Sequence, residues 1–201
     1  VAQSDIGIGD PASLPSGLIA YWSADGTTED AVGSNDGALQ NGASFATGMF
    51  RQAFSFDGVD DLFVAPSTGL PTGNSDRTIS LWVKADAFTT GESLLAGYGT
   101  FGSFSQTYQL GTSGDTLFFS QWGQAVLGPS LETGRWYNVA VTNVGDSVTL
   151  YLDGVAVETG TLPINTPADT AFLIGARPSG GSIPGLLQGE VDGVQVYDRA
   201  L

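Results

Sequence analysis

Carboxylate and amide side chains gather in one glycine-rich stretch near the start of the chain, residues 23–37, SADGTTEDAVGSNDG. Calcium takes six to eight oxygen ligands from carboxylates, amides, main-chain carbonyls and water. Asp25, Asp30, Asn35 and Asp36 offer such oxygens. The stretch lacks the spacing and the terminal Glu of an EF-hand. We favour a calcium site here over the alternative, in which these residues only build turns.

Two other places in the chain supply carboxylates. The segment FDGVDD, residues 56–61, holds Asp57, Asp60 and Asp61, and Asp192 lies near the end of the chain. Asp57 and Asp192 are candidate metal ligands. For Asp60 and Asp61 we favour a role in the turn, because Asp side chains commonly stabilise turns.

An irregular region, residues 94–128, is rich in aromatic side chains. Neutral sugars stack their C–H faces on aromatic rings, while amides and carboxylates bind their hydroxyl groups. The candidate ligand-binding residues of this region are Tyr98, Gln106, Tyr108, Trp122 and Gln124. They predict an exposed aromatic platform flanked by glutamines.

The alternative is that these rings fill the core, as aromatic residues at strand spacing usually do. Alternation along LFFSQWGQAV, residues 117–126, puts Phe118 and Trp122 on one face and Phe119 on the other. We expect Phe118 and Phe119, together with Trp82 of an earlier strand, to be core residues. For Trp122 and Tyr98, exposure and burial both remain open.

Glu190-Val191-Asp192 begins like Glu-x-Asp-x-x-Glu, a strand motif of some glycoside hydrolases whose first two carboxylates face the cleft together. Gln195 stands where that motif has its acid/base Glu, so no carboxyl group there can protonate the leaving oxygen. The chain has no His and no Cys, which excludes the usual Ser-His-Asp triad, imidazole bases and thiolate nucleophiles. We therefore expect a protein that is not an enzyme.

The elements that must position these residues are strands. Residues 136–159, WYNVAVTNVGDSVTLYLDGVAVET, alternate apolar and polar side chains on both sides of Gly145-Asp146. Asp153-Gly154 then supplies the two positive-φ positions of a type I′ turn. This pattern predicts a three-stranded antiparallel meander, whose apolar face needs a second sheet to cover it.

Similar alternation predicts further short strands, and no helix longer than a turn. These strands are expected at 17–22, within 38–50, twice within 51–64, and at 78–84, 93–98, 107–110, 116–121, 172–175 and 189–197. The fold class is therefore all-β, an antiparallel sandwich, in one domain spanning residues 17–201. Residues 1–16, which are small, polar and proline-bearing, read as a linker or arm from a larger protein.

The charge balance excludes several kinds of partner. The 201 residues include 6 basic and 21 acidic side chains, a formal net charge of −15. Such a chain repels phosphate backbones and anionic membrane surfaces, so we expect no nucleic-acid partner. It has no run of apolar residues long enough to span a bilayer, so we expect no membrane insertion.

Five segments in order resemble the bacterial laminin-G-like jelly rolls of the concanavalin A-like lectin/glucanase group. They are GLIAYWSADGTTEDAVGSNDGAL, FSFDGVDDLFV, TISLWVKAD, RWYNVAVT with LYLDGVAV, and GEVDGVQVYDRAL. Together they cover residues 17–201. Residues 77–131 carry few family motifs, and in this family the ligand surface usually lies in such variable parts.

The resemblance implies two stacked antiparallel sheets, neighbouring termini, and calcium near the opening loop with Asp30 and Asp192 approaching one ion. It also implies a binding or adhesion module of a larger secreted or cell-surface protein, with a glycan or cell-surface partner. A structural or protein-protein interaction module is the first alternative, and a glycoside hydrolase is the second. Trp122 separates the first two readings, because sugar binding needs it exposed and a purely structural role buries it.

Overall fold

The computed structural model describes residues 14–177 and 185–201. The predicted arm at residues 1–16 lies largely outside these residues. The described residues form fifteen strands and no helix. No helix in this part of the chain is therefore long and apolar enough to cross a membrane.

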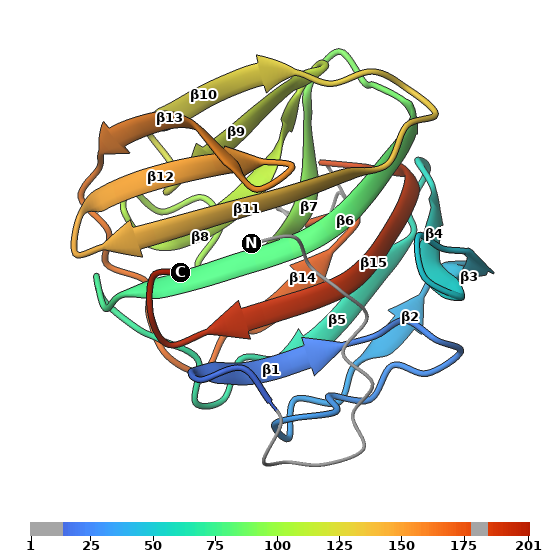
Figure 1. Cartoon of the computed structure of the whole chain (residues 1–201), viewed down its shortest axis with the longest axis horizontal. Coiled ribbons are helices and arrows are strands. Elements are labelled where there is room, and N and C mark those ends of the chain that lie inside the picture. The colour runs from blue at the N-terminus through green and yellow to red at the C-terminus, as the bar shows by residue number, and fades with distance from the viewer. Residues whose placement is uncertain (1–13, 178–184) are drawn as a thin grey trace.

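The strands form two antiparallel sheets that pack face to face (Figure 1). The eight-stranded sheet has the order β13-β12-β11-β6-β15-β4-β3, and β1 also pairs with β15. Its strands are β1 (Leu18–Trp22), β3 (Ser44–Thr47), β4 (Gln52–Asp57), β6 (Arg77–Ala87), β11 (Tyr137–Val144), β12 (Ser147–Leu152), β13 (Val155–Thr161) and β15 (Gln188–Tyr197).

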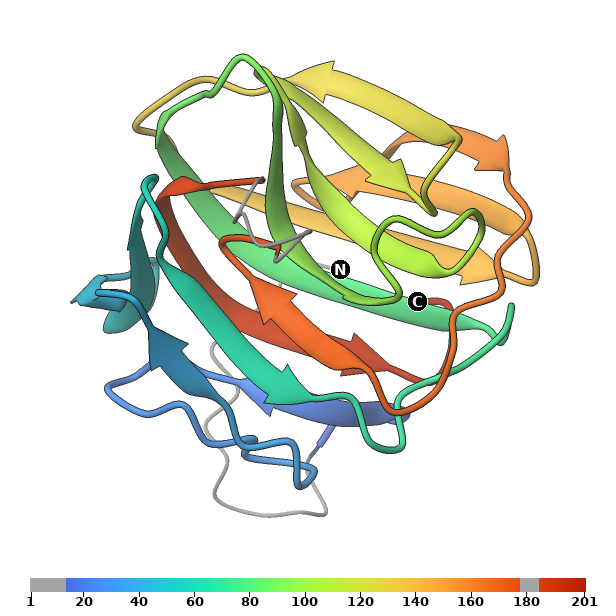
Figure 2. The ribbon, with the colours of Figure 1, turned by 180° about the vertical axis from the view of Figure 1, so that it is seen from behind.

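The seven-stranded sheet has the order β10-β9-β8-β7-β14-β5-β2 and faces the viewer in Figure 2. Its strands are β2 (Ala38–Gln40), β5 (Leu62–Pro66), β7 (Glu92–Gly99), β8 (Thr107–Ser113), β9 (Thr116–Ser120), β10 (Ala125–Ser130) and β14 (Ala171–Ile174). The predicted all-β sandwich is confirmed.

The predicted meander is present as β11, β12 and β13. Val139 pairs with Leu152 and Val141 with Leu150, so the apolar residues of both strands share the inner face. Asp153 and Gly154 have φ values of 51° and 78°, as a type I′ turn requires. The local sequence therefore fixes both the turn and the register of this part of the sheet.

Aromatic side chains fill the space between the sheets. The indole of Trp22 on β1 stacks on the ring of Phe172 on β14, with centroids 4.6 Å apart. Phe54 on β4 and Phe63 on β5 lie 4.8 Å apart. Each pair joins one sheet to the other, so this layer holds the sandwich together.

The first and last strands of the domain lie side by side. Tyr21 on β1 pairs with Gln195 on β15. Asp198 N donates to Gly17 O at 2.9 Å, and Arg199 Nε donates to Ser16 O at 2.8 Å. The two ends of the domain are therefore neighbours, as the family resemblance implied.

One strand lies outside every segment that was predicted to form a strand. β10 (Ala125–Ser130) contains Gly128 and Pro129, which weaken a strand pattern. It forms an edge of the seven-stranded sheet, where pairing with β9 on one side alone is enough. Its register slips between Leu127 and Ser130, because the proline lies in this stretch.

A fully buried cation lies at one end of the core. Arg77 at the start of β6 has no exposed surface, and no ion pair of the described residues includes it. Its Nη1 donates to the hydroxyl of Tyr98 at 2.9 Å, and its guanidinium lies 4.8 Å from the ring centroid of Tyr108. The remaining N–H groups donate to main-chain carbonyls of one loop, those of Pro71, Thr72, Gly73 and Ser75.

Arg77→Met should destabilise the fold strongly. The substitution leaves several buried carbonyls without donors, and each such group typically costs about 1–3 kcal/mol. Arg51→Met is the control, because the Arg51 side chain is 74% exposed and its ion pair contributes about 0–1 kcal/mol. Urea unfolding measures both. Equal effects of the two substitutions would contradict a structural role for Arg77.

Candidate functional site

The outer face of the seven-stranded sheet carries the candidate site. The strand register places one residue from each of five neighbouring strands in a row across this face. From β9 to β5 the row is Ser120, Gln109, Gly97, Leu173 and Val64. The side chains one position along, such as Tyr98 and Phe172, point into the core instead.

One end of this face is hollowed. An open hollow of about 520 Å³ lies over β5, β14 and β7. Its apolar walls come from Leu62, Val64 and Leu173, and the ring of Phe101 packs against the same cluster. Gly99 also lines it, and as a glycine it sends no side chain into the space. Polar groups come from the residues Gln40 and Thr100.

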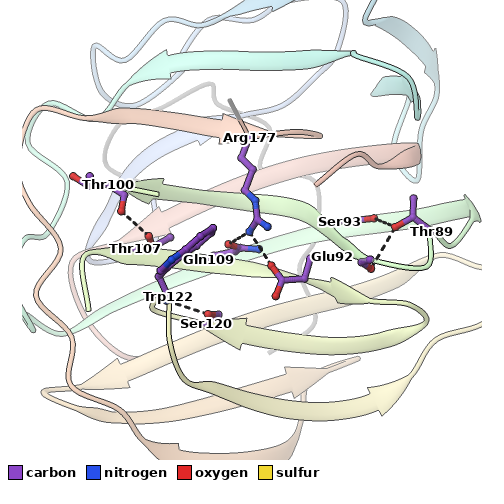
Figure 3. A network of polar contacts seen from close by, with 10 residues as sticks. Thr89, Glu92, Ser93, Thr100, Thr107, Gln109, Ser120, Trp122 and Arg177 are labelled. Carbon is purple, nitrogen blue, oxygen red and sulfur yellow. Dashed lines mark hydrogen bonds and ion pairs between the residues drawn. The ribbon is translucent and has the colours of Figure 1, made fainter. Parts of the chain in front are cut away.

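Trp122 lies on the same face, in the turn after β9. Its φ of 69° is in the left-handed region, so the chain leaves the strand at this residue. Its main-chain N–H donates to Ser120 Oγ at 3.0 Å. The indole is half-buried and lies over β8 beside Gln109 (Figure 3). Trp122 therefore presents part of its ring to solvent, as the sugar-binding interpretation requires.

An arginine holds this indole in place. The guanidinium carbon of Arg177, which follows β14, lies 4.7 Å from the ring centroid of Trp122. Its Nη1 donates to Glu92 Oε2 at 2.8 Å and to Gln109 Oε1 at 2.9 Å (Figure 3). Only 8% of Arg177 is exposed, so these contacts fix both the cation and the ring above it.

Two predicted ligand-binding residues are core residues. Tyr98 and Tyr108 are 1% and 0% exposed, and they pair with each other on the inner face of β7 and β8. Burial raises the pKa of Tyr98 to about 12, although the Arg77 cation opposes the change. The prediction that Tyr98 and Tyr108 form part of an exposed binding surface is wrong, because the strand register turns both rings towards Arg77.

The two predicted glutamines remain outside the core. Gln106 is half-buried in the loop between β7 and β8, and Gln124 is exposed just before β10. The two loops contact each other, since Ser105 N donates to Gln121 Oε1 at 3.0 Å. Both glutamines therefore lie at the end of the sheet that carries Trp122.

The predicted calcium ligand Asp30 is bound by the main chain. Its Oδ1 accepts hydrogen bonds from the N–H groups of Tyr21, Val32 and Gly33, and its Oδ2 accepts one from Asn35. Oδ1 is thereby fully engaged, whereas Oδ2 keeps one lone pair. Asp30 therefore organises the loop itself, and its role as a calcium ligand stays a prediction.

The other predicted metal ligands have separate partners. Asp25 accepts a hydrogen bond from Gln52 N and pairs with Arg51, while Asp192 Oδ2 accepts from Phe50 N at 2.8 Å. Asn35 donates its side-chain amide to Thr68 O, and Asp57 Oδ1 accepts from Val59 N. Among the described residues, Asp25, Asp30 and Asp192 belong to no group of three clustered acidic side chains. The carboxylates of the predicted set are thus not gathered in one cluster of the described residues, and the calcium site predicted there stays a prediction.

In the described part of the chain, one acidic group does bring three carboxylates together. Oxygens of Asp57, Asp60 and Asp61, in the turn between β4 and β5, all lie within 4.8 Å of one another. Asp61 is 5% exposed, its Oδ2 accepts from Asp57 N at 2.8 Å, and its Oδ1 has no hydrogen-bond partner. Burial, with the charges of Asp57 and Asp60 in addition, raises the pKa of Asp61.

The residues of the hydrolase-like motif lie on the outer face of the opposite sheet. Glu190 pairs with Lys84 at 3.1 Å, and Gln195 accepts a hydrogen bond from the hydroxyl of Tyr197. A register shift between Asp192 and Gln195 keeps the side chains of these two residues on the same face.

Some site residues were not found from the sequence. Phe101 lies in a loop with no strand pattern, and Arg177 is brought to Trp122 only by the sheet order. Trp82 was expected in the core but is half-buried on the outer face of β6, because Leu81 and Val83 take the inner positions. Phe118 is buried, yet it lies on the outer face and outside the main core cluster.

The chain belongs to a laminin G family that is described as the concanavalin A-like lectin/glucanases superfamily. Residues 57–201 match the family. The resemblance noted in the sequence is confirmed, although the opening loop lies outside the matched range. No curated protein matches the chain by sequence.

Several solved structures share the fold. Domain 4 of AbnA, an extracellular GH43 arabinanase of Geobacillus stearothermophilus solved in complex with arabinotriose, superposes with a TM-score of 0.73 at 23% identity, covering 92% of this chain and 93% of that domain. Trypanosoma rangeli sialidase in complex with sialic acid superposes with a TM-score of 0.70 at 21% sequence identity, covering 100% of this chain and 34% of the sialidase. The binding domain of Paraclostridial Mosquitocidal Protein 1 superposes with a TM-score of 0.72 at 13% sequence identity, covering 92% of this chain and 49% of that domain. The chain thus spans about a third of the sialidase and half of the toxin domain.

Asp61→Asn should stabilise the protein at neutral pH in the absence of divalent cations. The pKa of Asp61 is higher in the folded state than its ordinary value of 3.8, so the ionised carboxylate destabilises the fold. The free energy of unfolding therefore falls as the pH rises from the ordinary pKa through the folded-state pKa. An amide removes the charge and still accepts from Asp57 N. We therefore expect the variant to have a higher free energy of unfolding than the wild type at neutral pH.

Thermal unfolding at neutral and acid pH measures this effect. The gain should vanish below the ordinary pKa, where the wild-type carboxyl is protonated in both states. Asp86→Asn, at an exposed position of β6, is the control. A gain at acid pH as large as at neutral pH would show that the charge of Asp61 is not the cause.

Proposed function

We propose that this protein is a non-catalytic carbohydrate-binding module. The observation that supports the proposal most is that a hollow and a partly exposed aromatic ring lie on the same face of the seven-stranded sheet. An open hollow of about 520 Å³ is lined by Phe101 among others, and the half-buried indole of Trp122 lies on the same face. The hollow has the size of common ligand sites, which measure about 300–1,000 Å³.

The chemistry of this face suits an uncharged sugar. Aromatic rings offer stacking surfaces to C–H groups, and amide groups offer both donors and acceptors to hydroxyls. The cation of Arg177 lies against Trp122, and Glu92 already pairs with it. A ligand on this face therefore meets no unpaired positive charge from Arg177 that would favour an acidic sugar.

Similarity to the arabinanase domain supports the same class of ligand. That domain was solved with arabinotriose and aligns with this chain over nearly its whole length. At 23% identity the similarity concerns the fold, so we use it only to choose the first oligosaccharides to test. We further propose that the module belongs to a larger secreted or cell-surface protein, as the arabinanase is extracellular and its domain is one of several.

A structural calcium ion is also proposed, at a different place from the one predicted. The Asp57, Asp60 and Asp61 group offers carboxylate oxygens, including the buried Oδ1 of Asp61 that lacks a partner. Burial is the main reason that the pKa of Asp61 is raised, and the charges of Asp57 and Asp60 add to it; a bound cation would offset both effects. Sugar binding in this proposal does not involve the ion, because the turn between β4 and β5 is not part of the hollow.

Phe101→Ala and Trp122→Ala should each weaken glycan binding by about tenfold or more. Each removes one stacking ring, and a loss of about 1.4 kcal/mol is a factor of ten in affinity. A glycan array that includes arabinotriose and other neutral oligosaccharides identifies the ligand, and titration calorimetry measures the variants. Val144→Ala, at an exposed position of the other sheet, is the control. An array without any bound glycan would favour a protein-protein interaction module instead.

Enzymatic activity has its own test. The same oligosaccharides, incubated with the protein, should release no reducing sugar. Release that Glu190→Gln abolishes would establish the glycoside hydrolase alternative.

Calcium should raise the thermal midpoint of the wild-type protein over that in chelator, because the ion binds only the folded arrangement of carboxylates. Asp61→Asn should reduce the response, and Asp25→Asn should leave it unchanged. Differential scanning calorimetry in either condition gives the result. An identical wild-type midpoint with calcium and with chelator would refute the proposal.

A further inference from the structure

The outer face of the eight-stranded sheet has a second hollow, on the opposite side of the sandwich from Trp122. Its volume is about 290 Å³, and it is lined by Trp82, Trp136, Asn138 and Asp153. Trp82 on β6 pairs with Asn138 on β11. Asn138 N donates to Asp153 Oδ1 at 3.0 Å, so the strand register brings these residues together.

Neither indole belongs to the core between the sheets, and neighbouring residues hold both in place. The ring of Phe50 packs edge-on against Trp82, with centroids 6.1 Å apart. Lys84 Nζ lies 5.5 Å from the ring centroid of Trp136. Both indoles are half-buried. They are therefore preorganised surfaces rather than mobile side chains.

The charges around this hollow are balanced. Lys84 pairs with Glu190 at 3.1 Å, and Arg135 pairs with Asp153 at 3.3 Å. A charged ligand would have to compete with one of these pairs, whereas a neutral ligand would not. The side chain of Asp153 is 42% exposed, so its carboxylate can also accept a hydrogen bond from a ligand.

One polar atom of the hollow's aromatic wall lacks a partner. Trp82 Nε1 is buried and has no acceptor among the described residues. A buried donor without an acceptor is unfavourable, but this atom has no exposed surface, so a ligand in the hollow meets the rings and not this N–H. The matching ligand is thus flat and apolar on its ring faces and carries hydroxyl groups at its edges.

We propose that this hollow binds one ring of a neutral sugar, with stacking on Trp136 and Trp82 and a hydroxyl donating to Asp153. The volume, at the lower end for ligand sites, suits a single ring rather than an oligosaccharide. The site lies on the other sheet from the proposed glycan site and does not depend on it. A module with both sites binds two glycan chains at once and gains avidity from the pair.

The four tryptophans allow a direct test by NMR of their indole N–H signals. The probes are the methyl glycosides of glucose, galactose and arabinose. At least one should shift the signals of Trp82 and Trp136 in a saturable way. Trp22, which is fully buried and donates to Asn35 O at 3.0 Å, should not move and serves as the reference.

Two variants locate the effect. Trp136→Ala should weaken the binding measured at Trp82 by about tenfold, the loss of one stacking ring. Asp153→Asn should weaken it severalfold while the turn persists, because Asn-Gly favours the same turn type. Trp122→Ala is the matched control and should leave these shifts unchanged.

Three results would overturn the second site. They are no shift with any probe, a shift at Trp122 alone, and shifts at Trp82 that Trp136→Ala does not weaken. A shift at Trp122 alone would support the proposed function and reject this site. Shifts at Trp82 and Trp136 alone would support this site and count against the proposed glycan site at Trp122. The two proposals therefore fail separately.

Discussion

The contact between the two sheets is the constraint on which the rest of the structure depends. Each sheet has one apolar face, and both faces leave water only when they meet. The stacked pair Trp22 and Phe172 and the pair Phe54 and Phe63 cross this boundary. Once these rings are inside, period-two alternation decides which neighbours point outward. The rows of side chains on both outer faces are consequences of this core.

Two buried charged side chains order loops in this protein. Asp30 gathers four main-chain N–H groups, and Arg77 gathers the carbonyls of the loop before β6. In both cases the charged group meets backbone dipoles of the opposite sign. In the acidic opening loop, which the sequence predicts as a metal site, Asp30 binds main-chain N–H groups of the loop itself.

Prediction from the sequence succeeded for the fold and was partial for the site. The meander, the turn at Asp153-Gly154 and the family were predictable, because alternation and turn chemistry are local. Trp122 was found as a candidate, and the structure leaves its ring half-buried. Tyr98 and Tyr108 were assigned wrongly, since a strand pattern shows that two residues share a face but not which face is covered.

The sequence by itself determined the strands, their turns, the all-β class and the shortage of positive charge, because these follow from neighbouring residues and from composition. Tertiary structure alone decided which aromatic rings lie outside. It brought Arg177 over Trp122 and placed Trp82 beside Trp136, from segments far apart in the chain. The physical reason is that sheet order and register are set by the packing of the whole core, which no local pattern contains.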